Sequence, residues 1–167
     1  MYIILITMNM KDLTNKRIER RKYNSTLEKE GKISGTQEFF TPEKLCNEML
    51  DKIPAEAYEN LDTTFLDSTM GNGNFLVIIY DRKLMHCKTV NDAIKALKSI
   101  YGTELMEDNT NECRNRLYLR FKEYCKNKNL TAEQFKIASE KCCDVLRHNF
   151  VCTDTFKWDY ENWCSIE

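Results

Sequence analysis

The first strand, turn and helix of the expected fold are contained in one stretch, Thr63-Thr64-Phe65-Leu66-Asp67-Ser68-Thr69-Met70-Gly71-Asn72-Gly73-Asn74-Phe75. Its first five residues predict a short strand, and the scarcity of polar positions indicates cover on both faces, as in a parallel sheet. The two glycines at 71 and 73 mark a tight turn, because they have no Cβ to block a close approach. The apolar run 75–80 then predicts a helix that packs on the sheet.

The same alternation of strand and helix continues downstream. Capping-box patterns at Thr89-x-x-Asp92 and at 131–134 begin two helices, and Asp108 or Asn109 is expected to cap a third between them. Two further strands are expected over 99–105 and 148–154. The order predicts a doubly wound α/β domain with a parallel sheet, of which the chain holds the first three strands and their flanking helices. The expected inward residues of the last two helices are Cys113, Leu117, Phe121, Tyr124, Phe135, Ala138, Cys142, Val145 and Leu146.

Upstream of the glycine turn, Phe39-Phe40-Thr41-Pro42 leads into another helix. Thr41 is expected as its N-cap, with Pro42 at the first helical position. An apolar face of Leu45, Met49 and Ile53 is expected along it.

The sequence divides into three parts. Residues 1–34 are expected to form a polar N-terminal arm, 35–157 the folded domain, and 158–167 a C-terminal tail. The charge-dense run 8–34 is typical of a solvated helix or arm, with nucleic-acid contact as the minority interpretation. Met1–Thr7 is apolar and short, which favours a strand over a secretory signal.

Composition excludes several classes of protein. The chain has 167 residues, 42% hydrophobic and 31% charged, which is typical of one soluble globular domain. Its net charge of -1 argues against nucleic-acid binding through bulk positive charge. No apolar run is long enough to cross a membrane. The eight cysteines form no Cys-x-x-Cys pair, so we expect reduced thiols in a cytoplasmic protein and no metal site.

The ends of the three expected strands carry the residues that can bind a ligand. In an open parallel sheet, ligands lie beyond the carboxyl ends of the strands. The first strand ends at Asp67 before Gly71-x-Gly73, the second at Glu104, and the third at Asp154. Each feature alone has a structural alternative: a tight turn, a helix cap or a strand end. Together they predict an adenosine ligand, with Glu104 on the ribose hydroxyls and Asp154 on the adenine amino group.

Two phosphate-binding motifs are incomplete or absent, which reduces the number of candidate adenosine ligands. Leu76 stands where a dinucleotide-binding fingerprint needs its third glycine, and no Gly-Lys-Ser/Thr exists for a phosphate-binding loop. A glycine turn behind an aspartate, with no phosphate to bind, suits a cationic amino acid attached to adenosine. The predicted ligand is therefore S-adenosylmethionine.

The two motifs together resemble the cofactor-binding half of an S-adenosylmethionine-dependent DNA adenine-N6 methyltransferase. The resemblance implies a Rossmann-like class I methyltransferase fold over roughly 36–156, with the aromatic-Thr-Pro segment closing over the methionine end of the cofactor. It also implies DNA as the substrate, although methylation of RNA or protein uses the same cofactor half. The cofactor-binding residues carried over are Phe39, Phe40, Thr41, Pro42, Asp67, Thr69, Gly71, Gly73, Phe75, Glu104, Asp154 and Phe156.

One motif of that family is absent. These enzymes bind the target base with Asn/Asp/Ser-Pro-Pro-Tyr/Phe/Trp after the fourth strand, whereas the prolines here are the isolated Pro42 and Pro54. The sequence ends at Glu167, about where that strand would begin, so no catalytic residue is assigned. Trp158, Tyr160 and Trp163 are expected to pack.

The missing strand leaves the first strand as an apolar edge, which needs cover. Met1–Thr7 could supply it, as could a second polypeptide that brings the later strands and the contacts to DNA. Two hypotheses follow: a split or truncated DNA methyltransferase, or a non-catalytic module that binds the cofactor or a protein.

Overall fold

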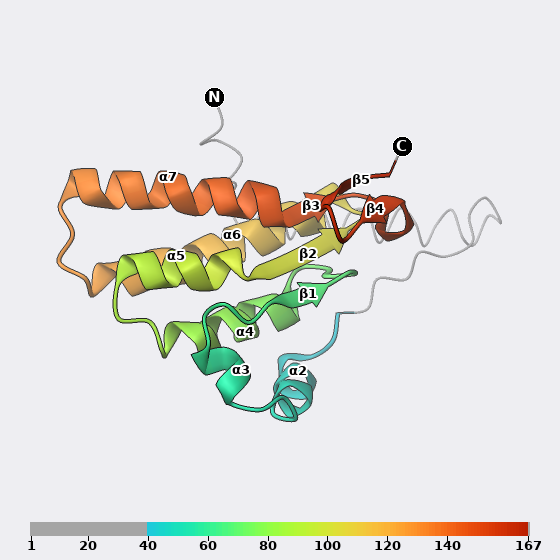
Figure 1. The fold of residues 1–167 in the computed structure, drawn as a ribbon, viewed down its shortest axis with the longest axis horizontal. Coiled ribbons are helices and arrows are strands. Elements are labelled where there is room, and N and C mark those ends of the chain that lie inside the picture. Colours follow the sequence, from blue (N-terminus) through green and yellow to red (C-terminus); the bar gives the residue numbers. More distant parts are fainter. Residues whose placement is uncertain (1–39, 167) are drawn as a thin grey trace.

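A computed structural model describes residues 40–166 of the chain (Figure 1). The expected N-terminal arm, the Met1–Thr7 strand, the domain boundary at residue 35 and Phe39 therefore lie outside the described residues.

Three parallel strands form the central sheet: β1 (Phe65–Asp67), β2 (Ile100–Glu104) and β3 (Phe150–Cys152). Their order is β1-β2-β3, with Asp67 opposite Gly102 and Glu104 opposite Cys152. The predicted α/β class and the three parallel strands are confirmed. Because the strands are parallel, their carboxyl ends meet at one edge of the sheet. Among the described strands, none pairs with the outer edge of β1.

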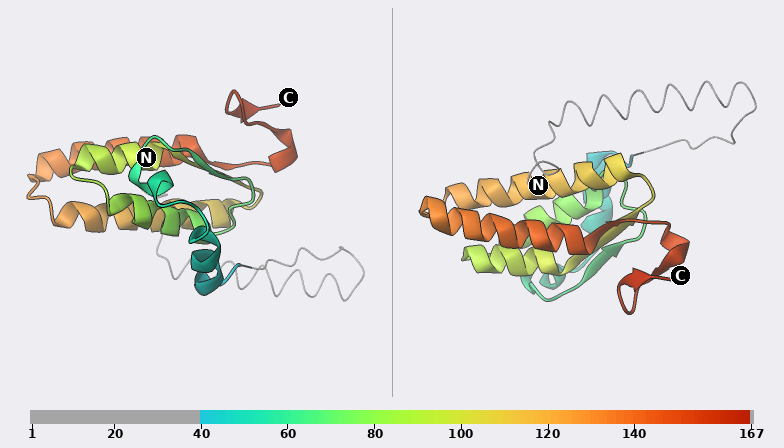
Figure 2. Two further views of the ribbon diagram at one scale, coloured as in Figure 1. Left: turned by 60° about the horizontal axis from the view of Figure 1, so that its bottom comes forward. Right: turned by 90° about the horizontal axis from the view of Figure 1, so that it is seen from above.

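Four helices pack with the sheet: α4 (Asn74–Leu84), α5 (Val90–Lys98), α6 (Glu107–Lys126) and α7 (Ala132–Asn149). Helices α5 and α7 lie side by side and lead into β2 and β3, whereas α4 and α6 form the layer below (Figure 2). Both predicted capping boxes are confirmed, at Thr89 for α5 and at Thr131 for α7.

The expected cap of α6 is wrong by two residues or more. The helix begins at Glu107 with Met106 as its N-cap, not at Asp108 or Asn109. The Oε1 atom of Glu104 accepts the backbone N–H of Met106 at 2.9 Å. This bond closes the turn directly after β2, so the chain enters the helix earlier than the cap pattern indicated.

The helix before β1 also differs from its prediction. Helix α2 (Glu43–Leu50) has Pro42 as its N-cap, with an extended ψ of 144°, so Pro42 is not inside the first turn. Its buried residues are Cys46 and Leu50, whereas Leu45 and Met49 are about half exposed. The spacing of four was right, but the face was wrong by one residue, because Cys46 takes the core position. The short helix α3 (Glu56–Glu59) follows, and Ile53 lies in the loop between the two helices.

The core lies between the sheet and the helices. Gly102 of β2 fits there because a Cβ on it would lie 2.5 Å from the Met70 sulfur and 2.8 Å from a Leu76 methyl group. The largest fully buried apolar side chains are Tyr80, Phe121, Phe150, Leu76, Leu97, Ile100, Leu117 and Leu146. Of the predicted inward residues, Cys113, Leu117, Phe121, Ala138, Cys142, Val145 and Leu146 are buried, whereas Tyr124 and Phe135 are partly buried against the core.

After β3, a 3-10 turn (η1, Thr155–Lys157) ends the expected domain, and the residues expected as a C-terminal tail form a hairpin of β4 (Trp158–Asp159) with β5 (Cys164–Ser165). The ring of Trp163 meets the ring of Tyr101 edge-on, with 4.8 Å between centroids. The hydroxyls of Tyr160 and Thr103 are 3.1 Å apart. Tyr101 and Thr103 alternate with the core-facing Gly102, so the hairpin packs on the other face of the sheet. The expected packing of these aromatic residues is confirmed.

Within residues 40–166, no helix has both the length and the apolar character needed to cross a membrane.

Candidate functional site

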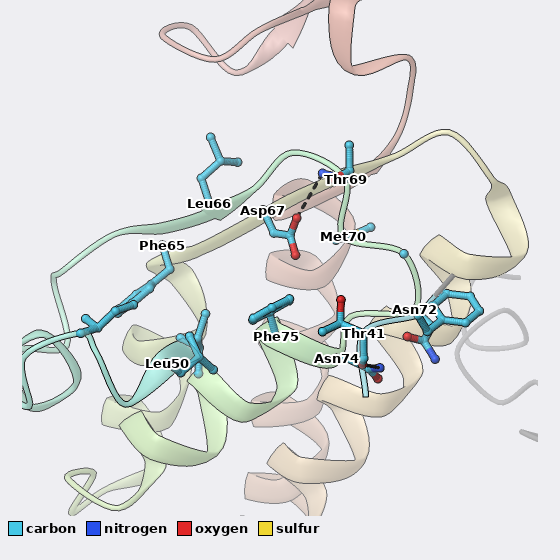
Figure 3. Close-up of a pocket in the computed structure, with 14 residues that line it drawn as sticks. Thr41, Leu50, Phe65, Leu66, Asp67, Thr69, Met70, Asn72, Asn74 and Phe75 are labelled. Atoms are coloured by element: carbon cyan, nitrogen blue, oxygen red, sulfur yellow. Dashed lines mark hydrogen bonds between the residues drawn. The ribbon is translucent and has the colours of Figure 1, made fainter. Parts of the chain in front are cut away.

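A cavity of about 440 Å³ opens at the carboxyl end of β1 (Figure 3). It lies between β1, the glycine turn, the start of α4 and the segment that leads into α2. Its volume falls within the range of roughly 300–1,000 Å³ that is typical of small-molecule sites. The lining residues are Phe40, Thr41, Leu50, Ile53, Phe65, Leu66, Asp67, Thr69, Met70, Gly71, Asn72, Asn74, Phe75 and Ile79.

Asp67 is the carboxylate of this cavity. It ends β1, and its side chain points toward Phe75 and the start of α4, away from Leu66 (Figure 3). Its Oδ1 atom accepts the Thr69 N–H at 3.2 Å. Burial raises the pKa of Asp67 above its ordinary value, and the nearby charge of Glu104 adds to that rise. The site therefore holds a carboxylate that a cationic ligand would stabilise.

The two glycines of the turn have different surroundings. Both have left-handed φ angles, +53° at Gly71 and +82° at Gly73. A Cβ on Gly71 would lie 3.1 Å from the Phe40 ring, inside the cavity, whereas a Cβ on Gly73 would lie 2.3 Å from the Cys113 sulfur. Gly71 thus lets the Phe40–Thr41 segment approach the turn, and Gly73 lets α4 pack against α6.

Glu104 lies next to the cavity but does not line it. Its Oε2 atom accepts the N–H of Gly71 at 2.9 Å, and its Oε1 atom accepts the N–H of Met106. The end of β2 is therefore joined to the glycine turn through this carboxylate. A carboxylate has about four lone-pair sites, so Glu104 keeps the capacity to accept further hydrogen bonds.

Asp154 and Phe156 lie outside the cavity, after the end of β3. Asp154 is the N-cap of η1, and its Oδ1 atom accepts the N–H of Phe156 at 3.0 Å. The Phe156 side chain is 91% exposed. The sequence left a strand end as the structural alternative for Asp154. Instead, β3 ends at Cys152 and Asp154 caps η1, with the exposed Phe156 ring nearby.

The cavity brings together six of the predicted residues: Phe40, Thr41, Asp67, Thr69, Gly71 and Phe75. Glu104 adjoins them through Gly71, Gly73 lies beneath the turn, and Pro42 begins α2 without lining the cavity.

Sequence reasoning missed the polar groups that support the turn. Asn74 donates from Nδ2 to the Thr41 carbonyl at 2.8 Å, and Arg116 donates from Nη1 to Asn74 Oδ1 at 2.7 Å. Asn72 donates to Glu112, but its Oδ1 atom is buried and has no hydrogen-bond partner among the described residues. Two asparagines between and after the glycines could have signalled these bonds, whereas nothing local in the sequence marks Arg116.

The comparison with protein families decides the identity. A family model described as N-6 DNA Methylase matches residues 20–162. The chain belongs to the N-6 DNA methylase family. No curated protein and no solved structure gave a match. The match covers the glycine turn, all three strands and the hairpin residues up to 162, so the described fold is that of an adenine-N6 DNA methyltransferase-like domain.

Methyltransferases of this family depend on S-adenosylmethionine, and the residues of the cavity fit that group. Asp67 would supply a carboxylate for its cationic amino-acid part, and the buried Asn72 Oδ1 atom, which has no donor among the described residues, would supply an acceptor. Gly71 leaves the space between the turn and Phe40 that a Cβ would fill.

Proposed function

We propose that this N-6 DNA methylase binds S-adenosylmethionine in the cavity at the end of β1 and is the cofactor-binding part of a DNA adenine-N6 methyltransferase. The observation that carries the proposal is the Asp67 carboxylate, which points into the cavity beside the Gly71 turn. We further propose that this arrangement of a parallel sheet and flanking helices belongs to the Rossmann-like class I methyltransferase fold.

Different residues of the chain would bind different parts of the cofactor. Asp67 would accept hydrogen bonds from the amino group of the methionine part, and Phe40 with Thr41 would close that end. Glu104 would hold the ribose hydroxyls, because its carboxylate already lies against Gly71. Asp154 and the exposed Phe156 ring would hold the adenine. When bound, the cofactor supplies the sulfonium methyl group for transfer to an exocyclic amine.

The acceptor half would come from outside this sequence. The Asn-Pro-Pro-Tyr type of motif is absent from the 167 residues, whose two prolines are both upstream of β1. The outer edge of β1 has no partner strand among the described residues, and Leu66 beside it is half exposed. A second polypeptide that adds strands to this edge would bury Leu66 and bring the base-binding motif and the DNA contacts to the cavity.

Calorimetric titration of the chain with S-adenosylmethionine tests the proposal. We expect saturable binding at one site, and its loss in Gly71→Val, because a β-branched side chain at φ +53° would push against the Phe40 ring. Pro54→Ala, in the loop after α2, is the control and should bind normally. Equal affinity in Gly71→Val would contradict the site.

A methyl-transfer assay tests whether the cofactor-binding and acceptor-binding parts lie on two polypeptides. With labelled cofactor and DNA, the chain alone should give no product, and addition of a polypeptide with the acceptor motif should restore transfer. Transfer by the chain alone would contradict the divided enzyme. Cofactor binding with no transfer under either condition would favour the non-catalytic module.

A further inference from the structure

A relay of three residues connects α6 to the segment that closes the cavity. Arg116 of α6 donates from one Nη1 atom to Asn74 Oδ1 at 2.7 Å and to the Asn72 carbonyl at 2.8 Å. Asn74, the first residue of α4, donates from Nδ2 to the Thr41 carbonyl at 2.8 Å. The relay therefore runs from Arg116 through Asn74 to Thr41.

The order of donors and acceptors gives the relay a direction. An amide side chain has distinct ends, and the guanidinium can only donate, so it must face the Asn74 oxygen. The Asn74 nitrogen is then turned toward Thr41, as Figure 3 shows for Asn74 and Thr41. Arg116 thus selects the orientation of Asn74 that can hold the Thr41 carbonyl.

The relay acts on the segment that leads into α2. Pro42 has no backbone N–H, and α2 has no side-chain cap at its N-terminus. The Thr41 carbonyl accepts hydrogen bonds from Asn74 and, at a longer 3.5 Å, from the Cys46 thiol of α2. The Asn74 bond joins the Phe40–Thr41 segment to the start of α4, directly after the glycine turn.

We propose that Arg116 is a positioning residue for the cofactor, which acts through Asn74 to hold Phe40 and Thr41 over the methionine end of the cavity. This inference rests on the proposed function. Arg116 does not line the cavity, whereas Thr41, Asn72 and Asn74 do. The relay therefore controls affinity for the amino-acid part of the cofactor and leaves affinity for the adenosine part unchanged.

Two substitutions separate this role from simple support of the fold. Arg116→Met removes the donor to both asparagines. Asn74→Asp keeps an acceptor for Arg116 and places a negative charge at a helix N-terminus, which is stabilising, but it removes the donor to Thr41. Arg120→Met is the matched control, because Arg120 lies one turn further along α6 and pairs with Asp81 of α4 at 3.1 Å.

The first measurement is hydrogen exchange by mass spectrometry on peptides that cover residues 40–50, without ligand. Loss of one hydrogen bond of about 1 kcal/mol corresponds to roughly fivefold faster exchange. We expect that increase in Arg116→Met and Asn74→Asp, and no change in Arg120→Met. Unchanged exchange in both relay variants would overturn the relay.

The second measurement is calorimetric titration with S-adenosylmethionine and with adenosine. Both relay variants should bind S-adenosylmethionine about fivefold to tenfold more weakly, for the same loss of roughly one hydrogen bond, and should bind adenosine as the unaltered chain does. Equal loss for both ligands, or no loss for either, would overturn the positioning role. If the unaltered chain binds neither ligand, the proposed function fails, and the exchange measurement still decides whether the relay holds the segment.

Discussion

Two ionisable groups, one near each end of α4, have opposite surroundings. Near the N-terminus of α4, the half-buried Asp67 of β1 faces the cavity and accepts a hydrogen bond from the Thr69 N–H. Near its C-terminus, Lys83 is fully buried, and its ammonium is surrounded by oxygens. These acceptors are the Asn60 carbonyl at 3.2 Å, the Leu61 carbonyl at 3.4 Å, the Thr63 carbonyl at 2.8 Å and the Ser99 hydroxyl at 2.9 Å.

The difference separates a structural charge from a functional one. The fold itself satisfies Lys83, which ties the loop before β1 to the end of α5. The fold leaves Asp67 with acceptor capacity turned toward a cavity. A buried charge without such partners costs free energy in the folded state, so a ligand that supplies donors gains what the fold left unsatisfied. Changes at Lys83 should therefore affect stability, and changes at Asp67 should affect binding.

Lys83→Met should have the largest effect. Methionine has a similar length but no donor, so three carbonyls and a hydroxyl lose the Lys83 donor, and of the carbonyls the one at Asn60 keeps another, the Thr63 N–H. We expect the free energy of unfolding to fall by about 3 kcal/mol, since each buried group left unsatisfied costs roughly 1–3 kcal/mol. Urea denaturation measures it. The control is Lys95→Met, whose exposed pair with Asp62 should contribute less than about 1 kcal/mol. Equal stability of the two variants would contradict a structural role for Lys83.

Asp67→Asn should reduce affinity for the cofactor without reducing stability, the opposite of Lys83→Met. We expect affinity for S-adenosylmethionine to fall about 10-fold to 100-fold, because a hydrogen bond to a charged group contributes roughly 1.5–3 kcal/mol. The free energy of unfolding at neutral pH should be unchanged or higher, since the variant removes a desolvated charge. Calorimetry and urea denaturation give the two values. Asp81→Asn, on α4 away from the cavity, is the control. A loss of stability without a loss of affinity would make Asp67 a structural residue.

The pH dependence of the free energy of unfolding, measured without ligand, should further distinguish Asp67 from Lys83. The pKa of Asp67 is raised above its ordinary value of 3.8 by burial. Between 3.8 and the raised pKa, the folded state holds the proton more tightly than the unfolded state. The contribution of Asp67 to stability is therefore present at low pH and is lost as pH rises through that window. Denaturation from pH 3.5 to 7 should show this decline relative to Asp67→Asn, and parallel curves would contradict it.

Lys83 should make stability change with pH in the opposite direction, in the alkaline range. Burial lowers the pKa of Lys83 from 10.5 to about 8. Between these values the unfolded state holds more protons than the folded state, so stability rises with pH. Buried thiols such as Cys87, whose pKa is raised to about 11, act in the other direction. The measured quantity is therefore the difference between the unaltered chain and Lys83→Met, which should widen from pH 8 to 10. A constant difference would contradict the lowered pKa.

Local patterns in the sequence predicted the elements of the fold well. The capping boxes at Thr89 and Thr131 fix their helices through bonds between residues three apart, which a sequence displays directly. Helix α2 was harder, because tertiary contacts chose its buried face. Cys46 took the core position that the pattern had assigned to its neighbour Leu45.

Sequence motifs and the order of the strands predicted part of the candidate site, including Glu104 beside Gly71, but not the groups brought there by the packing of helices. Asp67 and the glycines lie within one turn of chain, so their proximity could be inferred. Arg116 acts on a residue 42 positions away, and Lys83 acts on residues 16 to 23 positions away. The packing of α4 on α6, and of α4 against α5 and the loop before β1, brings these groups into contact. The role of Asp154 was not predictable for another reason. In sequence, a residue that caps the next turn cannot be distinguished from one that contacts a ligand.

The central claim, that the cofactor lies against the end of β1, is tested most directly by a crystal structure of the chain grown with S-adenosylmethionine. We expect density in the cavity, with the amino group at Asp67 and the methionine part beneath Phe40. Density at an unrelated surface, or an empty cavity at saturating ligand, would contradict it.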